Sequence, residues 1–136
     1  MKKNILTILI LFLGHLSFGQ IELGVSKDGV SAPKLWMESN VFTFGKIPLG
    51  IPVSISFELK NTGNAPLLFT KVEPSCNCTL LEYTKTEILP GQLGFVKATY
   101  DAKILGKFDK RIFVSSNAFE GAMDLILTGE VIYIKE

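Results

Sequence analysis

Residues 53–60 read VSISFELK, a stretch in which apolar and polar side chains alternate without a break. The apolar residues stand at positions 53, 55, 57 and 59, and serine, glutamate or lysine follows each of them. Successive side chains of a β-strand point to opposite faces, so the apolar set shares one face and the polar set shares the other. The stretch therefore predicts a strand with one face on a hydrophobic core and one face in water.

The same period of two recurs on both sides of this stretch. It is found in GFVKATYD (94–101), FDKRIFVSS (108–116) and DLILTGEVIY (124–133), which are rich in the β-branched and aromatic residues that strands favour. No run of ten residues shows the three-to-four apolar spacing of an amphipathic helix. The predicted strands are 35–38, 41–44, 53–60, 67–73, 79–83, 86–89, 93–100, 108–116 and 124–134.

Turn-forming residues separate these predicted strands. NTGNAP (61–66) contains several of them, and LPGQLG (89–94) places proline before glycine, which suits a type II turn with glycine supplying the positive φ. SSNAFEGA (115–122) separates the last two strands. Short strands with regular turns over about 100 residues predict an all-β, antiparallel β-sandwich of about seven to nine strands.

The first 20 residues, MKKNILTILILFLGHLSFGQ, have the three parts of a secretory signal peptide. Two lysines precede an apolar run over 5–13, and small residues stand three and one positions before a predicted cleavage site at Gln20. A transmembrane anchor is the alternative. It is disfavoured because a span needs roughly 20 apolar residues and this run is about half as long.

Cleavage would leave one domain without a transmembrane anchor. We expect a signal peptide over 1–19, a flexible leader over 20–33, a single domain over 34–136, and a periplasmic or secreted location. The processed chain loses its first two lysines, so 14 basic residues become 12 against 13 acidic ones, and it loses the only histidine, His15. A near-neutral chain without a basic run argues against nucleic acid and anionic membrane as partners.

Six short motifs follow one another along the chain. They are Phe-Gly (44–45), Asn-x-Gly (61–63), Ser-Cys-x-Cys-Thr (75–79), Pro-Gly (90–91), Gly-x-Phe (106–108) and Ser-Asn (116–117). This order, over about residues 35–131, resembles a family of secreted bacterial proteins of unknown function that is similar to the ASH-type and major-sperm-protein-type immunoglobulin-like modules. The resemblance implies an immunoglobulin-like sandwich and export, and it implies no reaction. Asn77 stands where the family usually has glycine, and asparagine also tolerates left-handed backbone.

The stretch EPSCNCTLLE (73–82) holds the only two cysteines, Cys76 and Cys78, and three interpretations of them stay open. In an oxidising compartment they would form a local disulfide or redox pair, whose small ring would be labile and would add little stability. Two thiolates would also suit Cu(I), whereas zinc would need more ligands than the processed chain supplies. Alternatively both act as small apolar side chains at a strand end. We expect no resident metal or other cofactor.

Catalysis by a nucleophile and a base is disfavoured, because the processed chain has no histidine to serve as the base. Two aromatic residues are candidates for partner contact. Trp36 is either a buried lid over one end of the sandwich or an exposed anchor, and Phe119, in the 115–122 loop, is expected to be the more exposed of the two.

An open sandwich has edge strands that can pair with an extended segment of another chain. The sequence therefore predicts a non-catalytic, exported immunoglobulin-like module that binds or scaffolds another protein of the cell envelope. The alternative is a thiol-based redox or Cu(I)-binding module that uses Cys76 and Cys78.

Overall fold

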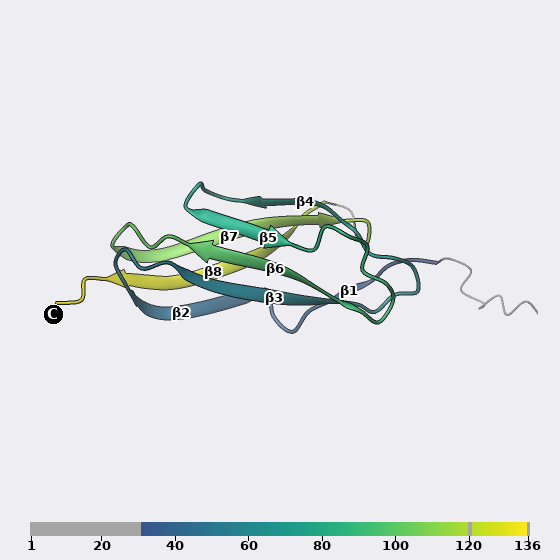
Figure 1. The fold of residues 1–136 in the computed structure, drawn as a ribbon, viewed down its shortest axis with the longest axis horizontal. Helices are drawn as coiled ribbons and strands as arrows, with labels where there is room; N and C mark the ends of the chain where they lie inside the picture. Colours follow the sequence, from purple (N-terminus) through teal and green to yellow (C-terminus); the bar gives the residue numbers. More distant parts are fainter. Residues whose placement is uncertain (1–30, 120, 136) are drawn as a thin grey trace, which may run out of the picture. The chain divides into compact units, whose positions relative to one another are not determined.

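The computed structural model describes residues 31–119 and 121–135. The predicted signal peptide, and the predicted leader as far as residue 30, lie outside this part of the chain. In the described part every regular element is a strand, and there is no helix. Eight strands form two four-stranded sheets (Figure 1). The predicted β-sandwich is confirmed.

The first sheet contains the stretch 53–60 and has the order β1-β3-β6-β5, with every neighbouring pair antiparallel. Its strands are β1 (Leu35–Trp36), β3 (Val53–Asn61), β6 (Leu93–Tyr100) and β5 (Thr79–Tyr83). In β3, Phe57 and Leu59 are buried, whereas the serines and Glu58 between the apolar residues are exposed. The alternation of apolar and polar residues in the sequence therefore matches the alternation of less exposed and exposed residues along β3.

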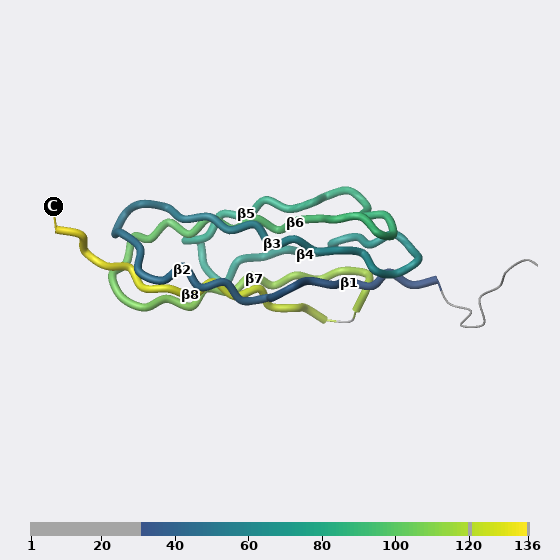
Figure 2. The backbone as a smooth tube through the Cα atoms, turned by 90° about the horizontal axis from the view of Figure 1, so that it is seen from below, coloured from purple at the N-terminus to yellow at the C-terminus, as the bar shows by residue number. Residues whose placement is uncertain are grey.

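The second sheet has the order β2-β8-β7-β4. Its strands are β2 (Val41–Pro48), β8 (Met123–Ile132), β7 (Gly106–Ser116) and β4 (Phe69–Pro74). Figure 2 shows the two layers, with β3, β5 and β6 along one side of the view and β2, β7 and β8 along the other.

One strand pair differs from the predicted antiparallel arrangement, because β2 runs parallel to β8. The chain pairs with β3 as β1, crosses to the other sheet over residues 37–40, and continues as β2 (Figure 2). Its direction is already set by the antiparallel pairing of β1 with β3, so it meets β8 in parallel. Alternating apolar and polar residues predict which side chains of a strand face the core. They do not predict whether the neighbouring strand runs parallel or antiparallel.

The strand predicted over 86–89 is also not formed. Ile88 makes only an isolated antiparallel bridge to Leu67, in which each residue donates its N–H to the other's carbonyl. The side chain of Ile88 is buried against Gly94, whereas the neighbouring Leu89 is exposed. Pro90 follows and has no N–H with which to extend a ladder. This apolar segment therefore closes one side of the core instead of adding a strand.

The core lies between the two sheets and takes side chains from both. The buried apolar residues of the strands are Ile47, Phe57, Leu59, Phe69, Val96, Ala98, Tyr100, Phe108, Ile112, Val114, Leu125, Leu127 and Val131. One aromatic contact joins the sheets directly, because the ring of Tyr100 in β6 lies 4.4 Å, between centroids, from that of Phe108 in β7. Phe44 of β2 lies 6.4 Å from Phe108 on the same measure.

Candidate functional site

Trp36 and the two cysteines, which the sequence singled out, belong to two separate sites at opposite ends of β6. At one end, the N–H of Asp101 donates to the carbonyl of Cys78, just after Tyr100. At the other end, Leu93 pairs with Lys60, which pairs in turn with Trp36 of β1. Seven residues of strand separate these ends, about 23 Å at 3.3 Å per residue. The cysteines and Trp36 therefore do not form one site.

The first candidate site is the outer edge of β3. β1 covers this edge only at Lys60 and Asn61. Among the described residues, no strand pairs with it between Val53 and Leu59. On its other side β3 is paired with β6 without a break in register from Val53 to Lys60.

The backbone groups that face this edge follow from the alternation of the ladder. Asn61 donates its N–H to Gln92 and accepts from Gly91, so its hydrogen bonds point toward β6. The direction alternates from residue to residue in an antiparallel strand. Ile55, Phe57 and Leu59 therefore also bond to β6, and the N–H and C=O groups of Ser54, Ser56 and Glu58 point to the open side.

A hollow of about 350 Å³ lies against this edge. Its walls are the crossover from β1 to β2 on one side and the middle of β3 on the other. The residues that line it are Trp36, Glu38, Ser39, Val41, Phe42, Ile55, Ser56, Phe57, Glu58 and Leu93. Trp36, Val41, Phe42 and Leu93 are all exposed, so the edge carries apolar surface beside the backbone groups of Ser54, Ser56 and Glu58.

The exposure of the two aromatic candidates is the reverse of the expected order. Trp36 is 56% exposed and lies in a row with Lys60 and Leu93 on the outer face of the first sheet. It is not a buried lid, because its pairing with Lys60 places it on the solvent face of the strand. Phe119, in the turn after β7, is half-buried. The sequence did not single out Ser56, Glu58 or Leu93, since their role depends on which strand lies beside β3.

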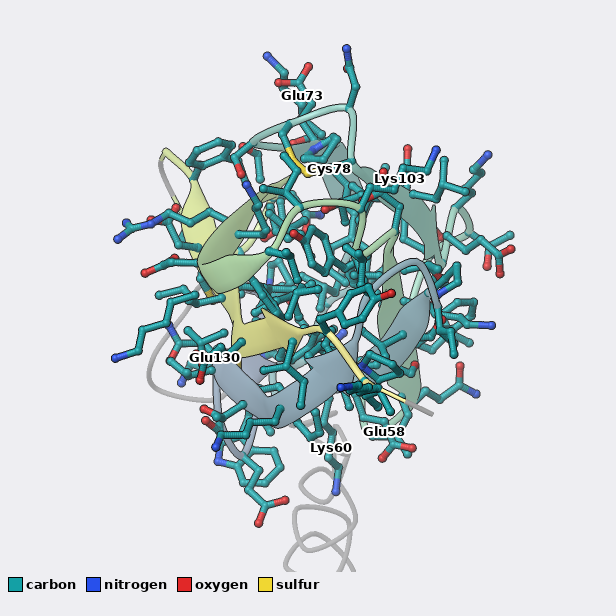
Figure 3. All side chains as sticks on the ribbon, turned by 90° about the vertical axis from the view of Figure 1, so that its left-hand side faces the viewer. Glu58, Lys60, Glu73, Cys78, Lys103 and Glu130 are labelled. Atoms are coloured by element: carbon teal, nitrogen blue, oxygen red, sulfur yellow. A yellow bond between two sulfur atoms is a disulfide. The ribbon has the colours of Figure 1, made fainter. Side chains whose placement is uncertain are left out.

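The second candidate site is the connection from β4 to β5, where Cys76 and Cys78 form a disulfide with Cα atoms 5.3 Å apart. Both cysteines are half-buried. Figure 3 looks onto this end of the sandwich, with the sulfur–sulfur bond beside the Cys78 label and Glu73 and Lys103 nearby. Within the described residues, no group of three or more His, Cys, Asp or Glu side chains is arranged to hold a metal ion.

Hydrogen bonds fasten this connection to both sheets. Ser75 donates its N–H to the carbonyl of Arg111 in β7, and its hydroxyl accepts the N–H of Arg111 at 3.0 Å. Cys78 is held to the end of β6 by the 3.0 Å bond from Asp101. The hydroxyl of Thr79 is buried and lies 3.9 Å from the sulfur of each cysteine. The Ser75 side chain and the backbone of Ser75 and Cys78 therefore hold this connection in place.

Tyr100, which pairs with Thr79 at this end of the sandwich, makes the stability of the fold depend on pH. Burial, and secondarily the Asp101 carboxylate, raise the pKa of Tyr100 above its ordinary 10.0. The folded state then binds the phenolic proton more tightly than the unfolded chain does. The stabilisation of the folded state is fully present below the pKa that Tyr100 has in the unfolded chain. It is lost as pH rises through the pKa that Tyr100 has in the folded protein.

We therefore expect the free energy of unfolding to fall above about pH 10, and Tyr100→Phe to make that fall shallower. Urea unfolding of both proteins between about pH 8 and pH 11 measures the difference. Tyr133→Phe changes an exposed ring and should behave like the wild type. Identical pH profiles for wild type and Tyr100→Phe would contradict the expectation.

The family model described as protein of unknown function, DUF1573, matches residues 35–131. The chain belongs to this family. The matched residues run from the start of β1 to the penultimate residue of β8, so the DUF1573 domain is the β-sandwich described above. The family resemblance read from the six motifs is thereby confirmed. No curated protein matches the chain.

Solved structures that resemble this DUF1573 domain share its fold at low identity. A protein of unknown function from Porphyromonas gingivalis W83 gives a TM-score of 0.66 at 17% identity, covering 74% of this chain and 48% of that one. The chain therefore spans about half the length of that protein. The ASH/PapD-like domain 7 of human CEP192 gives 0.61 at 13%, covering 78% and 90%. The YadV chaperone gives 0.52 at 14%, covering 76% and 54%. These likenesses show an immunoglobulin-like fold alone.

Proposed function

We propose that this chain is a non-catalytic module of the cell envelope that binds an extended segment of another protein along the open edge of β3. The observation that carries the proposal is the set of backbone groups at Ser54, Ser56 and Glu58 that no strand within residues 31–119 and 121–135 pairs with, beside an apolar hollow. Strand addition satisfies such groups with main-chain hydrogen bonds and gains specificity from pockets for alternate side chains. The predicted signal peptide would direct the module to the periplasm or the medium.

β1 already pairs with β3 in the way that we propose for the partner segment. Its two residues already pair with β3 in the antiparallel sense, after which the chain leaves the edge through residues 37–40. An incoming segment would take the place that a longer β1 would occupy. Its inward side chains would enter the hollow over Phe42 and Ile55, and its outward side chains would lie beside Trp36 and Glu58.

The lining of the hollow indicates the chemistry of the partner segment. Trp36, Val41 and Phe42 offer exposed apolar surface, which suits aliphatic or aromatic side chains in the partner. Glu38 and Glu58 add two exposed carboxylates at the same place. We infer a segment that alternates apolar residues with at least one lysine or arginine.

A proline at the edge tests strand addition directly. Because the N–H of Ser56 faces the open side, Ser56→Pro removes an edge donor and leaves the bonds between β3 and β6 in place. The matched control is Ser56→Ala, which removes the hydroxyl but keeps the N–H. A photo-crosslinking residue at position 54 would report the partner in the native envelope.

We expect a discrete crosslinked protein with the wild type and with Ser56→Ala, and a loss of at least about 10-fold with Ser56→Pro, consistent with the cost of an unmade edge bond and an excluded strand. Circular dichroism and urea unfolding should show that all three proteins are folded. A crosslink that survives in Ser56→Pro at the wild-type yield would rule out strand addition at this edge.

A further inference from the structure

The disulfide end of the sandwich has features that a purely structural bond would not need. The ring that Cys76 and Cys78 close contains only one intervening residue, and a disulfide that closes so short a loop adds little to stability. The connection is already fixed by the bonds from Ser75 to β7 and from Cys78 to the end of β6. The fold therefore does not depend on the sulfur–sulfur bond to hold this segment.

The two sulfurs differ in their surroundings. Cys78 packs against the hydrophobic core, whereas Cys76 is not among the residues that do so. Asn77 between them is exposed. An incoming thiolate therefore reaches the sulfur of Cys76 more readily, and the sulfur of Cys78 is the one placed to leave.

A hydroxyl group lies at the same distance from both sulfurs. The side chain of Thr79 is only 4% exposed, and in the described structure its hydroxyl is bonded to no group other than the two sulfurs, at 3.9 Å each. A buried hydroxyl normally has an oxygen or nitrogen partner. Here it is positioned to donate to a thiolate, the form in which a cysteine leaves a disulfide.

We propose that Cys76–Cys78 is a thiol–disulfide exchange site for a cysteine-containing partner protein. A thiolate of the partner attacks the sulfur of Cys76, a partner–Cys76 disulfide forms, and the bond to Cys78 breaks. Cys78 leaves as a thiolate held by the Thr79 hydroxyl and takes a proton from water. A second thiolate of the partner then attacks the partner sulfur of this mixed disulfide, and Cys76 leaves as a thiolate that takes a proton from water. The partner dithiol has become a disulfide, and the disulfide of the module has been reduced to two thiols. This activity is independent of the strand addition proposed for β3.

The connection from β4 to β5 is held in place by hydrogen bonds, and this favours reversible opening of the disulfide. The hydrogen bonds of Ser75 and Cys78 do not involve sulfur, so they persist after reduction and keep the two cysteines adjacent. In the partner–Cys76 disulfide, attack of the Cys78 thiolate on the Cys76 sulfur reforms the Cys76–Cys78 bond and releases the partner thiolate, and this exchange is intramolecular at high effective concentration. Cysteines that sit within one residue on a fixed loop are suited to repeated opening and closing.

The exported protein itself can be tested with dithiothreitol and oxidised glutathione as probes. Intact mass after alkylation reports the disulfide, and circular dichroism reports the fold. We expect dithiothreitol to open the bond while the sandwich stays folded. Cys78→Ser, which leaves Cys76, should form a mixed disulfide with oxidised glutathione about 10-fold faster than Cys76→Ser, because the remaining thiol is the more accessible one.

The role of the Thr79 hydroxyl is tested separately, by the rate at which the disulfide opens in Thr79 variants. Thr79→Val should slow the opening of the bond by about 3- to 10-fold and should shift the pH–rate profile of the Cys76→Ser thiol to higher pH, since a donor to the thiolate is lost. Thr79→Ser keeps the hydroxyl and should restore the wild-type rate. The proposal is overturned if the bond opens only as fast as the protein unfolds, if the two single-cysteine variants react equally fast, or if Thr79→Val opens at the wild-type rate.

Discussion

Asn61→Ala is expected to lower the free energy of unfolding by about 3–5 kcal/mol, because it removes four hydrogen bonds of a buried side chain, at roughly 1 kcal/mol each, and leaves a cavity. Asn61 is fully buried at the end of β3. Its amide donates to the carbonyls of Ala65 and Ile88, both at 2.8 Å. Its oxygen accepts the N–H groups of Gly63 at 3.0 Å and Lys34 at 3.4 Å.

The matched control is Asn64→Ala, three residues along the same turn. Asn64 is exposed, and its oxygen accepts one hydrogen bond from the N–H of Ala32. We expect that change to cost less than about 1 kcal/mol, because water replaces the lost partner. Urea unfolding at neutral pH compares the two variants, and equal losses would show that the buried position of Asn61 carries no special weight.

The role of Asn61 illustrates what the sequence could and could not predict. The Asn-x-Gly motif predicts a turn, and a turn does follow β3. The structure shows in addition that Asn61 joins β1, β3 and the bridge at Ile88. Gly63 is required for packing, since an added Cβ would lie 2.8 Å from the carbonyl carbon of Pro33. These contacts link residues about 30 apart, which a local pattern does not report.

Strand existence was predicted well because it depends on local alternation. The strands 79–83 and 93–100 have the predicted bounds, and β3 extends the predicted 53–60 by one residue. The parallel pairing of β2 and the open edge of β3 were not predicted, because each depends on which strand lies beside which. The same reason explains Trp36, whose exposure follows from its pairing with Lys60. The cysteine pair is recognisable in the sequence because its members are two positions apart. The edge of β3 brings together residues from distant segments, and Trp36 alone among the residues that line its hollow was a candidate from the sequence.

Phe108→Ala is the second change with a large expected effect, about 3–5 kcal/mol lost from the free energy of unfolding, since a buried phenylalanine leaves a cavity. Phe108 stacks on Tyr100 across the sheets. It also pairs across strands with Gly129, the residue that interrupts the apolar face of β8. An added Cβ on Gly129 would lie 2.6 Å from Cζ of Phe108. The Phe108 ring therefore occupies the space in which a side chain at position 129 would lie.

This contact predicts a change in the effect of Gly129→Ala between two backgrounds. In the wild type the new methyl group meets the Phe108 ring, so we expect a loss of about 1–3 kcal/mol from overpacking. In Phe108→Ala the ring is gone, and only the carbonyl oxygen of Gly45, 3.0 Å from the added Cβ, remains close. The same change should then cost less than about 1 kcal/mol or stabilise the protein, because the methyl group fills part of the cavity. A double-mutant cycle by urea unfolding measures this coupling, and strictly additive losses would show that the ring and the glycine do not share that space.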